Sequence, residues 1–186
     1  MPSGITNEAL FRWGVVIGVS LVAAVCDLRT RRIPNALTIP LLLVGLIRAA
    51  WLGGLSGLAE AVGTCILLAL PFVLLYLFAG GGAGDAKLMA AIGAWLKVAQ
   101  GIKVLLCVTA AGIVLAIAKA VMRKSLRLVL TNVFVSAYTF MLSLLGRKTE
   151  KLANQADADQ PARLTIPYGV AIFAGVCITA GIDLLW

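Results

Sequence analysis

Long apolar runs, separated by short polar links, occupy most of the chain and limit what it can fold into. A run of about 20 apolar residues is long enough to cross the hydrocarbon core of a bilayer as a helix. Lipid offers no partners to backbone N–H and C=O groups, so regular helices are expected to make the crossings. Hydrophobic residues make up 61% of the chain and charged residues 13%, unlike a soluble domain. The sequence therefore predicts an all-α polytopic membrane protein.

The apolar runs predict about six membrane-spanning helices. Pro34 is expected to fix a short extended link between the first two, since the residue before a proline avoids helical backbone. The predicted spans cover approximately residues 9–26, 34–52, 58–79, 86–98, 101–121 and 169–186. Because no polar stretch is long enough to fold alone, we expect residues 1–186 to form a single domain.

Residues 126–145 form one further apolar segment, whose polar side chains fall in a narrow stripe at helical spacing. Basic clusters flank this segment on both sides. A crossing here would place the two clusters on opposite sides of the membrane, although loops rich in Lys and Arg stay in the cytoplasm. We therefore expect an amphipathic helix in the cytoplasmic interface, followed by a polar loop over residues 147–163.

The distribution of positive charge sets the predicted topology. Twelve of the sixteen Lys and Arg residues lie around positions 29–32, 87, 119–127 and 147–163. With six crossings, these loops are cytoplasmic and both termini lie outside. We interpret the net charge of +8 as this topology signal, which also attracts anionic lipid head groups, and we expect no nucleic-acid partner.

The composition gives little support to metal or thiol chemistry. The chain contains no histidine, and its four cysteines stand singly in or beside apolar runs, without a C-x-x-C pair. These features exclude the usual structural zinc spacings and any histidine-based triad. We expect no metal ion and no cofactor.

A glycine-rich stretch, residues 80–87, follows the third predicted span and contains Asp85. Irregular backbone is tolerated at membrane depth only where protein or a wet cavity surrounds it. Glycine lacks a Cβ atom, so this loop can turn tightly and approach another segment closely. An acid in such a place is a candidate functional residue, and Asp27, at the cytoplasmic end of the first span, is its expected partner.

Two carboxylates at one end of a helical bundle suggest acid–base catalysis. An ionised carboxylate can take a proton from water while a protonated one polarises a peptide carbonyl, so the pair can hydrolyse an amide. Asp85 is predicted at the N-cap of the fourth span, where the helix dipole favours its anion. We therefore predict Asp85 as the base and Asp27 as the acid. Taken singly, each acid is better explained as an interface residue or a cap, so the prediction depends on their shared position.

At these residues the chain resembles a known family. Gly82-Ala83-Gly84-Asp85 matches the G-x-G-D motif of membrane aspartic proteases. The surrounding segments resemble the type IV prepilin leader peptidases, in their short form that serves Flp or tight-adherence pili. The similar segments are Asp27 followed by Arg32-Ile33-Pro34-Asn35, residues 84–88, and Ile166-Pro167-Tyr168-Gly169.

The resemblance implies an endopeptidase of the bacterial inner membrane, with Asp27 and Asp85 as its catalytic aspartates. It would remove the leader from prepilin-like precursors at the cytoplasmic side. Gly82, Gly84 and Lys87 would support the site, whereas Pro34, Asn35, Pro167 and Tyr168 would contact substrate or serve a structural role. Larger family members add an N-methyltransferase activity and an insert with paired C-x-x-C motifs, and this chain has neither the insert nor the cysteine pairs. The oligomeric state is not predicted.

Three other interpretations of the acids remain open. Asp27 and Asp85 could form the proton relay of an ion-coupled transporter or channel subunit, although such folds commonly contain an internal repeat and none is found. The chain could be an assembly scaffold whose acids are inactive. Presenilin-like proteases share the G-x-G-D motif, but here no Tyr precedes the first Asp and the last span lacks Pro-Ala-Leu.

Overall fold

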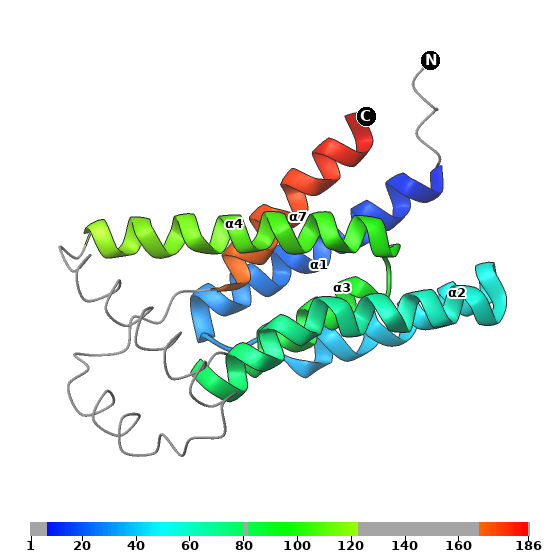
Figure 1. Ribbon diagram of the computed structural model, residues 1–186, viewed down its shortest axis with the longest axis horizontal. Coiled ribbons are helices and arrows are strands. Elements are labelled where there is room, and N and C mark those ends of the chain that lie inside the picture. Colours follow the sequence, from blue (N-terminus) through cyan, green and yellow to red (C-terminus); the bar gives the residue numbers. More distant parts are fainter. Residues whose placement is uncertain (1–6, 80–81, 123–167, 186) are drawn as a thin grey trace, which may run out of the picture. The chain divides into compact units, whose positions relative to one another are not determined.

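The computed structural model describes residues 7–79, 82–122 and 168–185, and the elements in these ranges are helices (Figure 1). The chain divides into two compact units, residues 1–114 with 167–186 and residues 115–166. Of the second unit, only the end of one helix is described. The predicted interfacial helix 126–145 and the polar loop 147–163 therefore lie outside the described residues.

Four helices in the described ranges are long and apolar enough to cross a bilayer. They are α1 (Asn7–Thr30), α2 (Asn35–Ala79), α4 (Val98–Met122) and α7 (Tyr168–Leu185). The prediction of an all-α membrane protein is confirmed, whereas the count of six spans stays a prediction.

α2 consists of two helical arms that meet at a turn. Gly54 has φ 59° and ψ −146°, a backbone conformation that glycine adopts readily and other residues rarely do. A Cβ atom at Gly57 would lie 2.6 Å from the carbonyl oxygen of Ala49, so the chain passes close to itself here. Figure 1 shows α2 reversing direction at this turn, with its arms side by side. The predicted glycine turn between the second and third spans is thus confirmed.

α3 (Ala83–Gly93) is short, and its boundaries differ from the predicted range 86–98. It begins three residues earlier, because Gly82 has extended backbone and acts as the N-cap. It ends five residues earlier, where Gly93 packs against α2 so closely that a Cβ atom would lie 2.8 Å from the Cα atom of Cys65. The 11 residues of α3 rise only about 16 Å, roughly half of the hydrocarbon core. α3 is therefore not counted among the spanning helices.

The core of the first unit forms where these helices meet. α3 packs mainly on α2, and its side chains Leu88, Met89 and Ile92 are fully buried. α7 packs along α1 and also touches α4, where a Cβ atom on Gly175 would lie 2.6 Å from the Cα atom of Val108. Three buried hydroxyls donate to carbonyls of their own helices four residues earlier, which satisfies them without water. These hydroxyls belong to Ser20, Thr64 and Thr179.

Candidate active site

Three helix ends gather at one end of the first unit: the C-terminal end of α1 and the N-terminal ends of α3 and α7 (Figure 1). Each of these ends carries one of the polar residues predicted for the site. Asp27 lies in the last turn of α1, Asp85 in the first turn of α3, and Tyr168 begins α7.

Asp27 is held by the first turn of α7. The backbone N–H of Gly169 donates a hydrogen bond of 2.9 Å to Asp27 Oδ2. The first four N–H groups of a helix have no partner within it, so this turn offers its free donors to the carboxylate. Asp27 itself is only 9% exposed. A buried carboxylate is thus tied to a helix that lies more than a hundred residues away along the chain.

Gly169 permits this contact because it has no side chain. A Cβ atom at that position would lie 2.9 Å from the Cβ atom of Asp27 and 3.1 Å from its Oδ2. The Cα atom of Ala24 would be only 3.3 Å away. Gly169 therefore belongs to the site, although the sequence interpretation counted its neighbours Pro167 and Tyr168 instead. The sequence feature that could have indicated this role is a glycine directly after Pro-Tyr at the start of the last predicted span.

A second glycine makes room for Asp85. A Cβ atom on Gly82 would lie 2.7 Å from Asp85 Oδ2, so the carboxylate occupies the space that any larger residue would fill. The Asp85 N–H donates to the Gly82 carbonyl at 3.2 Å. The predicted N-cap position of Asp85 is wrong, because Gly82 caps the helix and Asp85 is its third residue.

The two aspartates lie within each other's electrostatic field. Burial, together with the negative charge of Asp27, raises the pKa of Asp85 to about 7. The charge of Asp85 also acts on Tyr168. A carboxyl group keeps its proton to a higher pH where burial and a neighbouring negative charge both disfavour its anion. The site therefore combines one carboxyl group that holds its proton near neutral pH with a second carboxyl group close by.

The link between α1 and α2 packs against the N-terminal part of α3. A Cβ atom on Gly84 would lie 3.2 Å from the Cβ atom of Ile33. Lys87 Nζ donates a hydrogen bond of 3.1 Å to Asn35 Oδ1, which joins α3 to the first residue of α2. Pro34 stands between these two contacts, and its carbonyl accepts the N–H of Leu37 at 3.0 Å. Gly84 and Lys87 thus anchor the N-terminal part of α3, which carries Asp85.

The structure brings most of the predicted site residues to one place. Gly82, Asp27, Asp85 and Tyr168 lie together, and Gly84, Lys87, Pro34 and Asn35 form the adjoining anchor. Pro167 lies outside the described residues. Among the described residues, no group of three or more His, Cys, Asp or Glu side chains could hold a metal ion. The arrangement brings two carboxyl groups from different helices to the same end of the first unit.

Comparisons with known proteins show which family the chain resembles. The model of the type IV leader peptidase family matches residues 14–117, a range that contains both aspartates. Two prepilin leader peptidase/N-methyltransferases, from Burkholderia pseudomallei strains 1026b and K96243, are each 38% identical over 105 residues. The match covers 51% of this chain and 31% of each relative. No solved structure matches the chain. Since the family match covers more than half of the sequence, the chain belongs to the type IV leader peptidase family.

Proposed function

We propose that this protein is a membrane aspartic endopeptidase that removes the leader peptide from type IV prepilin-like precursors. Family membership and the two prepilin leader peptidase relatives support this activity. The observation that carries the proposal is the electrostatic effect of Asp27 on Asp85. Asp27 is buried, Asp85 is half-buried, and the two acids come from different helices. The match covers 31% of each relative, so we propose only the peptidase activity, for residues 1–186 as one domain.

The proposed reaction uses one water molecule and one proton shared by the two acids. Asp27, ionised, takes a proton from the water as the water oxygen attacks the carbonyl carbon of the scissile peptide bond. Asp85, protonated, donates a hydrogen bond to the carbonyl oxygen. When the C–N bond breaks, a proton from the pair passes to the leaving amine, and the pair again holds one proton.

These roles are the reverse of those predicted from the sequence. Asp85 was predicted as the base because it was placed at a helix N-cap, but burial and the charge of Asp27 raise its pKa to about 7. An N–H group can only donate, so the Asp27 oxygen that faces Gly169 is an acceptor. The raised pKa of Asp85 supports its role as the resting acid, which leaves Asp27 as the resting base.

We place the site on the cytoplasmic side of the bacterial inner membrane. Arg29, Arg31 and Arg32 follow Asp27 directly, and Lys87 lies two residues after Asp85. Loops rich in Lys and Arg stay in the cytoplasm, so this end of the bundle is expected to face inward. A leader at the N-terminus of a membrane-inserted precursor would reach the two acids from that side. Nothing in the described residues specifically favours a transporter.

The pH dependence of cleavage follows from the proposed roles. Because Asp85 acts as the acid, activity requires its protonated form, which is lost as the pH rises through a pKa of about 7. We expect the rate to fall about tenfold per pH unit above that value. The measurement is cleavage of a prepilin by the purified chain in liposomes between pH 6 and 9. A rate that stays constant over this range would mean that Asp85 is not the acid.

Co-expression tests the activity itself. The chain is expressed with a panel of prepilin-like precursors, and leader loss is followed by gel mobility and by N-terminal sequencing of the product. We expect at least one precursor to be shortened at a single bond just before its apolar helix. Failure to shorten any precursor, by a chain that is folded in the membrane, would contradict the proposed function.

A further inference from the structure

A cavity of about 540 Å³ lies between α1 and the first arm of α2, at the other end of these helices from the aspartates. Glu8 on its wall precedes Asp27 by nineteen residues, or about 28 Å along α1 at 1.5 Å per residue. That distance is close to the thickness of the hydrocarbon core. The cavity therefore faces the leaflet opposite the candidate active site. We call it the Arg48 pocket, and its walls include Glu8, Phe11, Ile47, Arg48, Trp51 and Leu52.

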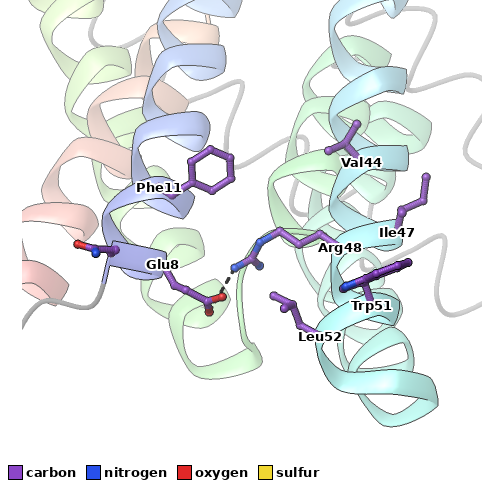
Figure 2. Close-up of a pocket in the computed structure, with 8 residues that line it drawn as sticks. Glu8, Phe11, Val44, Ile47, Arg48, Trp51 and Leu52 are labelled. Atoms are coloured by element: carbon purple, nitrogen blue, oxygen red, sulfur yellow. Dashed lines mark ion pairs between the residues drawn. The ribbon is translucent and has the colours of Figure 1, made fainter.

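The Arg48 pocket has an apolar part and a charged part. Figure 2 shows Phe11 on α1 and Ile47 on α2, with Arg48 reaching from α2 toward Glu8 on α1. Phe11, Ile47 and Leu52 are exposed, and Trp51 is 87% exposed. Tryptophan is enriched at the level of the lipid head groups, with its ring against the chains. The walls thus suit an acyl chain, and the rim suits a head group.

The charged part holds more hydrogen-bond donors than acceptors. Arg48 approaches Glu8 at 3.7 Å, which is an ion pair but too long for a hydrogen bond. Arg12 lies behind the pocket wall rather than on it, near enough to Arg48 and Glu8 to interact with their charges, and its Nε atom is buried with no partner among the described residues. Asp183, the other acid that acts on Arg12, already accepts hydrogen bonds from three donors. These donors are Trp13, Gln100 and Lys103.

A phosphate group would supply the missing acceptors. Because Asp183 already pairs with Lys103, two arginines and Glu8 leave a net charge of +1 near the pocket. Guanidinium groups bind phosphate oxygens through pairs of N–H donors. A ligand with a phosphate at one end and a hydrocarbon chain at the other would match both parts of the pocket. In a bilayer, the abundant molecule of this kind is a phospholipid.

We propose that the Arg48 pocket binds one anionic phospholipid of the leaflet opposite the active site, with its phosphate at Arg48 and Arg12 and one acyl chain against Phe11 and Ile47. The bound lipid fills the space between α1 and the first arm of α2, two elements that pack on each other only slightly. It also offers a hydrogen-bond acceptor to Arg12, whose Nε atom has no partner among the described residues. The site is independent of the proposed peptidase activity.

Native mass spectrometry of the purified full-length chain tests the site, with phosphatidylglycerol and phosphatidylethanolamine as probes. We expect the wild type to retain one phosphatidylglycerol in preference to phosphatidylethanolamine. Arg48→Gln should weaken phosphatidylglycerol binding about tenfold, the effect of losing one charge-assisted hydrogen bond. Glu8→Gln should strengthen it about two- to fivefold, because a competing negative charge at an exposed pair is removed. Lys97→Gln removes the same charge as Arg48→Gln outside the pocket, and should change nothing.

Two further variants keep the test decisive if Arg48→Gln fails to fold. Ile47→Trp fills the apolar part while leaving both arginines in place, and should also weaken lipid binding. A photoreactive residue at position 51 should cross-link to lipid. The proposal is overturned if the wild type shows no preference for phosphatidylglycerol, if Lys97→Gln weakens binding as much as Arg48→Gln, or if position 51 cross-links only to protein. That last outcome would identify a second copy or a substrate helix as the occupant.

Discussion

Replacing either Asp27 or Asp85 by asparagine is expected to lower the rate of leader cleavage at least about a thousandfold, since each residue is assigned one half of an acid–base reaction. Asparagine has nearly the same shape, and at position 27 its carbonyl oxygen can still accept the Gly169 N–H. At position 85 it removes a carboxyl group whose anion is disfavoured by burial and by Asp27. Both variants should therefore fold. The measurement is the rate of prepilin cleavage by purified variants in liposomes.

Glu60→Gln provides the matched control for these two variants. Glu60 is an exposed acid on α2, away from the aspartate pair, so its neutralisation should leave the rate within about twofold. Substantial activity in either asparagine variant, at wild-type expression and thermal stability, would exclude that aspartate from the reaction. Loss of activity in Glu60→Gln would instead indicate that any loss of charge disturbs the fold.

Gly169→Ala is expected to reduce cleavage about a hundredfold although it changes no charge, because displacing a catalytic group by about 1 Å can cost that much. The added Cβ atom would lie 2.9 Å from the Cβ atom of Asp27 and 3.3 Å from the Cα atom of Ala24. Neither neighbour is the flexible end of a side chain, so α7 must move away from α1. The hydrogen bond to Asp27 Oδ2 is then lost or lengthened. The measurement is again the cleavage rate in liposomes.

The control for Gly169→Ala lies on the same helix. A Cβ atom on Gly181 would meet nothing within 4 Å, so Gly181→Ala should fold and cleave like the wild type. Alanine also favours helix over glycine by up to about 1 kcal/mol, which applies equally to both variants. If Gly169→Ala retained full activity, the close approach of α7 to Asp27 would have no part in catalysis.

Local chemistry in the sequence was enough to predict several parts of the fold. The glycines at 53, 54 and 57 interrupt a long apolar run, and the structure turns there through Gly54. The apolar runs predicted a helical membrane protein, because a run of that length has few other structures open to it in lipid. The pairing of Asp27 with Asp85 followed from placing both at the same side of the membrane. These inferences needed only the residues themselves and the bilayer as solvent.

The parts that were missed depend on contacts between distant segments. α3 ends at Gly93 because that glycine packs against the backbone of α2, which the sequence around it does not reveal. The importance of Gly169 appears only when α7 is seen beside Asp27. The proposed roles of the two acids differ from those predicted from the sequence for the same reason. The helix-dipole argument considered α3 alone, whereas burial and the charge of Asp27 act on Asp85 from its surroundings.

The central claim is that Asp27 and Asp85 act as one coupled pair, and a site-resolved titration of the Asp85 carboxyl group tests it most directly. Selective ¹³C labelling of aspartate carboxyl groups would give the Asp85 signal in the wild type and in Asp27→Asn, assigned by its absence from Asp85→Asn. We expect Asp85 to titrate with a pKa of about 7 in the wild type. In Asp27→Asn its pKa should fall but stay above the ordinary value of 3.8, because burial remains while the neighbouring charge is gone. An Asp85 titration that is unchanged by Asp27→Asn, or that lies near the ordinary value in the wild type, would contradict the account.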